Sequence, residues 1–198
     1  MKWYFDDGPL GHLARVFNPN WSSPPSALFV VDVVAGAAGQ DRSGRRQQLL
    51  GMTSGGHPCI EVVSIPAGSD VERMVFTYLR PQYTHATRDL GEDATIAHLA
   101  LGDQDGVFVT CDKGAGYLAI CELGPGRVAS PFDVWTWLAD ERLISEAERM
   151  VLNEAILKGD RSLPGGTFSA VKWLRRPRSD AHASGCAGGT RVASVATV

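Results

Sequence analysis

The sequence predicts an α/β protein with a parallel central sheet. Apolar runs of strand length alternate with helix-like stretches five times along the chain, which is the pattern of strand–helix–strand units. The runs at 27–31 and 107–110 are almost wholly apolar, as expected of strands covered on both faces. We therefore expect a three-layer α/β/α sandwich with roughly five parallel strands joined by right-handed crossovers.

Turn and capping signals set the boundaries of these elements. Gly8 and Pro9 stop the first strand, and Ser69 with Glu72 forms a capping box that opens a helix. Gly124 closes a later helix. The expected strands are 2–5, 27–31, 59–64, 107–110 and 127–130. The expected helices are 10–17, a stretch from 33, 70–80, a stretch from 92, 113–123, 132–144 and 146–158.

The composition fits one domain with an extension. The chain has 198 residues, of which 44% are hydrophobic, enough for a sizeable core. We place the domain at 1–160 and expect the extension at 161–198, polar and glycine-rich in its later part, to be largely disordered. The net charge of −3 gives no whole-molecule attraction to nucleic acid, although a local basic rim could supply one.

The cysteines and the hydropathy pattern indicate a compartment. The four cysteines show neither a CxxC pair nor zinc-ligand spacing, so we expect reduced thiols in a cytoplasmic protein. No apolar run approaches the ~18 residues of a membrane span. The N-terminus also lacks the basic and apolar regions of a signal peptide. We therefore expect no membrane association.

Acidic residues follow the ends of two strands and begin one helix. Asp6 and Asp7 come directly after the first strand, and Asp112 follows the fourth. Glu92 and Asp93 begin a helix whose apolar stripes continue from both acids. Open α/β sheets bind their ligands beyond the carboxyl ends of the strands, so we expect these acids to meet there.

Such a group of carboxylates suits a divalent cation. Like charges a few ångströms apart repel one another unless a cation lies between them. Oxygen-only ligands favour Mg²⁺ or Mn²⁺, which can activate water for phosphodiester hydrolysis. Asp133 also follows a strand, but it stands three residues after Ser130, the spacing of a capping box, so a structural role is an equal alternative.

Other catalytic patterns are absent from the sequence. It has no Ser-His-Asp order and neither a GxGxxG nor a GxxxxGK[ST] motif, which leaves metal-assisted hydrolysis as the best enzymatic interpretation. A phosphate-accepting signalling domain would also place acids at strand ends. That class needs a lysine at the end of the last strand, and RVAS at 127–130 offers none.

Four short stretches between Lys2 and Leu152 match one family in order and spacing. They are YFDDGPLGHLARV, DATIAHLAL, FVTCDKGAGYLA and RVASPFDVWTWL. In these stretches the chain resembles the PIN-domain nucleases, which include the toxin ribonucleases of toxin–antitoxin pairs. The resemblance implies a three-layer α/β/α fold, divalent-metal-dependent cleavage of single-stranded RNA, and often a dimer with an antitoxin partner.

Carried over to this chain, the resemblance implies metal ligands at Asp6, Asp93 and Asp112, with Glu92 as a neighbour or substitute. These four acids are the expected catalytic residues, and Mg²⁺ or Mn²⁺ is the expected cofactor. The chain departs from the family at positions 36–37, where glycine and alanine stand instead of a glutamate. A degenerate, non-catalytic protein that binds RNA or protein is therefore the alternative hypothesis.

Basic residues suggest where a nucleic acid would lie. Arg42, Arg45 and Arg46 are the best candidates for phosphate contacts, with an ordinary solvated helix face as the alternative. The expected partners are an RNA substrate, an antitoxin protein and a second copy of the chain. His98 lies on the polar stripe of its helix and is expected at the surface.

Overall fold

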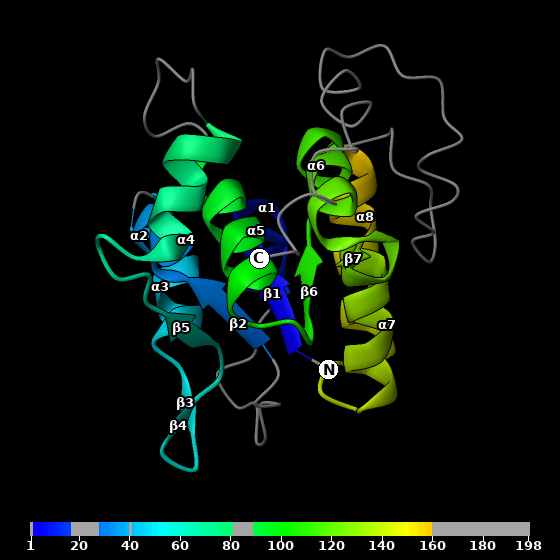
Figure 1. Ribbon diagram of the computed structural model, residues 1–198. Coiled ribbons are helices and arrows are strands. Elements are labelled where there is room, and N and C mark those ends of the chain that lie inside the picture. The colour runs from blue at the N-terminus through cyan, green and yellow to red at the C-terminus, as the bar shows by residue number, and fades with distance from the viewer. Residues whose placement is uncertain (1, 17–27, 40, 81–88, 160–198) are drawn as a thin grey trace.

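A five-stranded parallel sheet runs through the middle of the molecule (Figure 1). The computed structural model describes residues 2–16, 28–39, 41–80 and 89–159, so the expectation for the extension at 161–198 lies outside the described residues. In spatial order the strands are β5 (Glu61–Val63), β2 (Leu28–Val31), β1 (Lys2–Phe5), β6 (Gly106–Val109) and β7 (Val128–Ala129). Every neighbouring pair is parallel, which confirms the predicted sheet.

The central strands are apolar because helices cover both of their faces. Every residue of β2 and β6 is buried. In the register of the sheet, Tyr4 stands between Phe29 and Phe108. Phe5 stacks on Trp135 with 6.0 Å between ring centroids, and both side chains are fully buried. The core therefore lies on both sides of β1.

Two helical layers enclose the sheet. The helices are α1 (Asp7–Val16), α2 (Asp32–Ala38), α3 (Arg45–Leu50), α4 (Asp70–Met74), α5 (Leu90–Leu101), α6 (Lys113–Leu123), α7 (Pro131–Asp140) and α8 (Glu146–Gly159). One layer packs α1 against α3 and α8, and the other packs α5 against α4 and α6. The chain leaves β1 towards β2 first and only later returns to β6, so right-handed crossovers put α1 and α6 on opposite faces. The predicted three-layer α/β/α sandwich is confirmed.

The predicted capping box at Ser130 is complete, whereas at Ser69 only the half made by the serine side chain is present, because the Glu72 carboxylate accepts from the amide of Gly68. The amide of Glu72 donates to the hydroxyl of Ser69 at 3.2 Å, and α4 begins there. The carboxylate of Asp133 accepts hydrogen bonds from both the amide and the hydroxyl of Ser130, each at 3.0 Å. Asp133 therefore has the structural role given above as one of its two alternatives.

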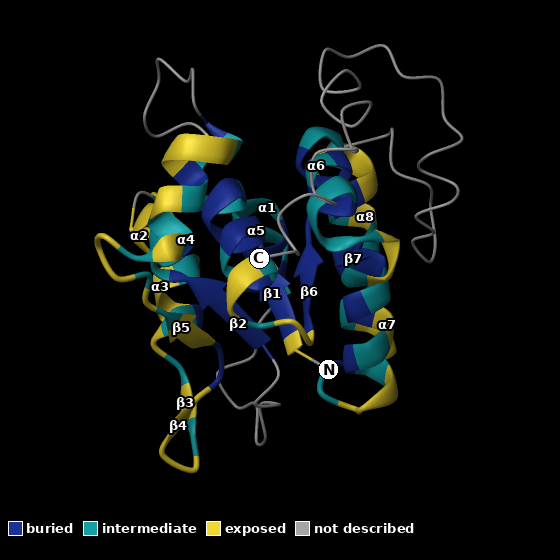
Figure 2. Cartoon of the chain, in the orientation of Figure 1, coloured by how far each residue is buried: buried dark blue, intermediate teal, exposed yellow. Residues whose placement is uncertain are grey.

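Two local features differ from the sequence prediction. The strands β3 (Thr53–Ser54) and β4 (His57–Pro58) form a small antiparallel hairpin that projects from the body of the molecule and is largely exposed (Figures 1 and 2). Its turn is Gly55–Gly56, with φ of 59° and 84°, a left-handed conformation that glycine adopts at little cost. The helix expected over 70–80 changes to a π-helix, η1, at Val75–Leu79.

The thiol expectation is only partly correct. Cys59 and Cys111 form no disulfide, whereas Cys121 on α6 is disulfide-bonded, so the prediction that all four cysteines are reduced is wrong for Cys121. None of the described helices is long and apolar enough to cross a membrane, as predicted.

Candidate functional site

A pocket of about 650 Å³ opens beyond the carboxyl ends of β1 and β6. These neighbouring strands flank the point where the strand order reverses, which is the position at which open α/β sheets bind ligands. Five acids line the pocket, and they come from three separate parts of the chain. They are Asp6, Asp7, Asp89, Glu92 and Asp112.

Asp6 lies at the floor of the pocket, directly after β1, and is only 6% exposed. One carboxylate oxygen accepts a hydrogen bond from the amide of Asp7 at 2.6 Å, and the other accepts one from the hydroxyl of Thr110 at 3.0 Å. Burial raises the pKa of Asp6 from its ordinary 3.8 to about 6, and the charges of Asp7 and Asp112 act in the same direction. The side chain is therefore fixed in orientation, but its ionised form is disfavoured.

Asp112 stands at the mouth of the pocket as the N-cap of α6. Its side chain accepts a hydrogen bond from the amide of Ala115 at 3.0 Å, and the residue is exposed. Its own amide donates to the hydroxyl of Thr110 at 2.9 Å. Thr110 therefore links Asp6 to Asp112, since the same hydroxyl donates to the first acid and accepts from the second.

Glu92 faces the pocket from the first turn of α5. Its carboxylate has no hydrogen-bond or ion-pair partner among the described residues. Burial raises the pKa of Glu92 from its ordinary 4.5 to about 9, and the charges of Asp6 and Asp112 add to the effect. A half-buried carboxyl without a partner and close to other carboxyls destabilises the fold. The stability of the fold therefore does not explain why a glutamate stands at this position.

Asp93, the next residue, is not brought into the pocket. Its carboxylate pairs with the guanidinium of Arg80 at 3.3 Å, and the two side chains are 8% and 1% exposed. Successive residues of a helix point about 100° apart, and the rotation of α5 turns Glu92 towards the pocket and Asp93 towards Arg80. Of the two acids at the start of α5, Glu92 therefore lines the pocket with the other acids and Asp93 does not.

The wall opposite Asp6 and Asp112 comes from α2. Val33, Val34 and Ala37 line the pocket there. Ala37 is exposed, at one of the two positions where the resemblance to the PIN family implies a glutamate. The pocket therefore lacks the glutamate that the resemblance implies at this position.

The three candidate phosphate-binding arginines have different surroundings. Arg46 forms an ion pair with Asp7 at the edge of the pocket. Arg45 is exposed and donates to the backbone carbonyl of Arg15 at 3.3 Å. Arg42 is exposed, and it does not line the pocket. Only Arg46 of these three contacts an acid of the pocket.

The sequence did not lead us to Thr110, Cys111 or Asp89, which the structure places in or beside the pocket. Thr110 is 1% exposed and bonds to two of the acids, as described above. Cys111 and Asp89 line the pocket directly. A polar residue that ends an otherwise apolar strand was the available signal for Thr110.

The acids do not form a ready-made metal cage. As the side chains stand in the part of the chain described, no group of three or more His, Cys, Asp or Glu residues is arranged to hold one ion. Asp6 is turned towards Asp7 and Thr110, and Asp112 towards Ala115. The donors still have the chemistry that Mg²⁺ or Mn²⁺ requires, because they are carboxylate oxygens that repel one another and include the unpartnered Glu92.

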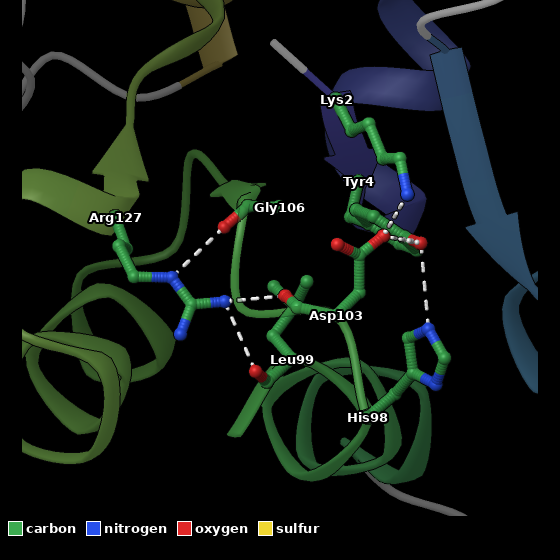
Figure 3. Close-up of polar contacts among 7 residues, drawn as sticks. All are labelled: Lys2, Tyr4, His98, Leu99, Asp103, Gly106 and Arg127. Atoms are coloured by element: carbon green, nitrogen blue, oxygen red, sulfur yellow. Dashed lines mark hydrogen bonds and ion pairs between the residues drawn. The ribbon is translucent and has the colours of Figure 1, made fainter. Parts of the chain in front are cut away.

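A second polar cluster lies at the opposite end of the sheet (Figure 3). The carboxylate of Asp103 accepts from Lys2 at 2.8 Å and from the hydroxyl of Tyr4 at 2.7 Å, and His98 lies 3.4 Å from the same hydroxyl. Arg127 donates to three backbone carbonyls between α5 and β6. These contacts tie the start of β1 to the α5–β6 turn. The prediction of a surface His98 is only partly correct, because the residue is half-buried with its ring packed against Tyr4.

Comparisons of the chain with protein-family models, with curated proteins and with solved structures found no match. The PIN resemblance therefore depends on the residues of this chain alone.

Proposed function

We propose that this chain is a divalent-metal-dependent ribonuclease of the PIN type. The observation that carries the proposal is the meeting of Asp6, Glu92 and Asp112 around one pocket at the switch point of the sheet. They come from the end of β1, the start of α5 and the end of β6. Two of them have a pKa raised by burial and by the charges of the others.

In this proposal Asp6, Glu92 and Asp112 hold Mg²⁺ or Mn²⁺. When bound, such an ion activates water and neutralises charge on the phosphate. Thr110 positions Asp6, and Arg80 holds Asp93 so that α5 presents Glu92. An ion would have to draw the three carboxylates closer than they stand, which is the expected response of like charges to a cation.

The first experiment measures cleavage of a labelled single-stranded RNA with Mn²⁺ or with EDTA. Asp112→Asn should abolish Mn²⁺-dependent cleavage, because an amide lacks the charge that holds the ion. Asparagine is also a good N-cap, so the stability of α6 should be retained. The control is Asp133→Asn, which alters an acid of similar position that caps α7. Cleavage by Asp112→Asn at the wild-type rate would contradict the proposal.

A non-catalytic binding protein of the same fold is the second candidate. The observations that favour it are the absent acid at Ala37 and the lack of a ready-made ligand cage among the described residues. This candidate predicts no heat on calorimetric titration with Mn²⁺, whereas the ribonuclease predicts saturable binding that Asp112→Asn removes. An antitoxin partner and a second copy of the chain remain predictions under both candidates.

A further inference from the structure

We infer that Arg46 is the residue that binds a phosphate of the RNA strand beside the acidic pocket. This inference rests on the proposed function, since it names the group that holds the substrate of that same site. It assigns the role to one arginine among the three basic candidates of the sequence. Three observations carry it: the contact of Arg46 with the pocket edge, the packing of its guanidinium against the backbone of α1, and its unused hydrogen-bond donors.

The contact places a cation at the rim of the pocket. Arg46 lies in the first turn of α3, and its guanidinium forms an ion pair with the carboxylate of Asp7, a pocket-lining residue. The amide of Asp7 in turn donates to Asp6. One residue therefore separates the guanidinium from the acid at the pocket floor.

A glycine of α1 leaves room for the guanidinium of Arg46. A Cβ atom built on Gly11 of α1 would lie 2.5 Å from Nη2 of Arg46 and 2.9 Å from Nε. The guanidinium therefore lies directly against the bare backbone of α1. Glycine inside a helix is less favourable than alanine, so Gly11 serves the position of Arg46 and not the stability of α1.

The guanidinium has donors left for a second anion. It has five N–H donors, and Asp7 is its only side-chain partner among the described residues. Its side chain is 24% exposed, so these donors can be reached. Arg15 also lies near this part of α1: burial and the charges of Arg15 and Arg46 together lower the pKa of the half-buried His12 to about 4. Arg46 thus brings a positive charge to the rim of an acidic cavity.

The charge of the pocket explains the need for such a rim. Five acids line it, and a single divalent ion does not cancel them. A polyanionic strand would be repelled unless cations contact its phosphates outside the cavity. Arginine suits that role because its planar fork matches two phosphate oxygens.

The test measures binding of a 12-nucleotide single-stranded RNA by fluorescence anisotropy in EDTA, over a series of salt concentrations. Arg46→Gln should raise the Kd about 10-fold or more, because a charge-assisted bond is lost. It should also reduce the magnitude of the slope of log K against log salt by about 0.7, the contribution of one phosphate contact to a single strand. In Mn²⁺ it should raise KM and leave kcat within about twofold.

Two further variants make the result specific. Gly11→Ala keeps the charge of Arg46, but the added methyl group occupies the space of its guanidinium. The variant should therefore weaken RNA binding without lowering the unfolding midpoint. Arg149→Gln is the matched control: Arg149 on α8 is 29% exposed and pairs with Glu146, which is not an acid of the pocket. It should bind RNA as the wild-type protein does.

RNA affinity of Arg46→Gln equal to that of Arg149→Gln would overturn the inference, and so would a wild-type protein that binds no RNA. The ribonuclease proposal is judged separately, by the Mn²⁺-dependent cleavage that Asp112→Asn removes. A protein that binds RNA through Arg46 but does not cleave it would refute that proposal and support this inference.

Discussion

Thr110 is the residue on which the geometry of the acids depends. Its hydroxyl donates to Asp6 and accepts from the amide of Asp112, so one buried side chain fixes the relation between two acids from different strands. The bond to Asp6 also favours the ionised carboxylate and lowers its pKa against the effect of burial. Residues that orient ligands in this way commonly change metal affinity without touching the ion.

Replacement of this hydroxyl tests that role. Thr110→Val keeps the size of the side chain but leaves Asp6 without one of its two hydrogen bonds. We expect Mn²⁺ affinity to fall about 10- to 100-fold by calorimetry. The loss should be larger at pH 6 than at pH 8, because a higher pKa of Asp6 lets protons compete with the ion. Thr136→Val on α7 removes a hydroxyl bonded to Phe132 and serves as the control; equal affinities in the two variants would contradict the role.

At the scale of elements, the pocket depends on how closely α5 approaches α2. Gly91 in the first turn of α5 packs against Val34, and an added Cβ would lie 2.7 Å from a methyl carbon of that valine. Val34 is 1% exposed and has little room to move. The glycine therefore lets the helix start reach the position from which Glu92 faces the acids.

An added methyl group at this contact should separate the two helices. We expect Gly91→Ala to lower the free energy of unfolding by about 1–3 kcal/mol, because overpacking outweighs the gain in helix propensity. Val34→Ala in the same chain should recover part of the loss, and a double-mutant cycle in urea measures the coupling. Gly36→Ala on α2 meets open space and should stabilise by about 0.5–1 kcal/mol. Additive effects of the first two changes would argue against the contact.

At the scale of the whole molecule, the metal-free fold holds carboxyl groups that resist ionisation. A carboxyl whose folded pKa lies above its unfolded value binds its proton more tightly in the folded state. Stability is then lost as the pH rises from the unfolded towards the folded pKa. For Glu92 this window runs from about 4.5 to about 9. Below about pH 6.5, Asp6 and His12 also titrate, with opposite effects on stability, so the upper part of the window is the clearer one.

The pH dependence of unfolding tests this account. In EDTA, the free energy of unfolding should fall between pH 6.5 and 9 by about 1 kcal/mol per pH unit, the effect of one extra proton on the folded state. Glu92→Gln should remove most of this slope, because an amide does not titrate. Glu154→Gln alters an exposed acid on α8 and should keep it. The measurement is urea unfolding at each pH, and a flat wild-type profile would rule out the raised pKa.

Local signals in the sequence were enough for most of the fold. Apolar runs predicted the strands, and the capping boxes at Ser69 and Ser130 predicted where helices begin, because these interactions join residues only three apart. The hairpin at Gly55–Gly56 also has a signal in the sequence, a glycine pair between short extended segments. The change to a π-helix after Met74 had no such signal.

The sequence by itself determined the fold class and the position of Asp6 and Asp112 directly after two strands, since strand alternation and acids at strand ends are properties of the chain order. Only the tertiary structure decided which of Glu92 and Asp93 faces the pocket. Both stand at the helix start, and the choice depends on the rotation of α5, which its packing against Val34 and the Arg80–Asp93 pair fix. The same holds for Thr110 and Arg46, whose partners are distant in sequence and meet only once the layers have packed.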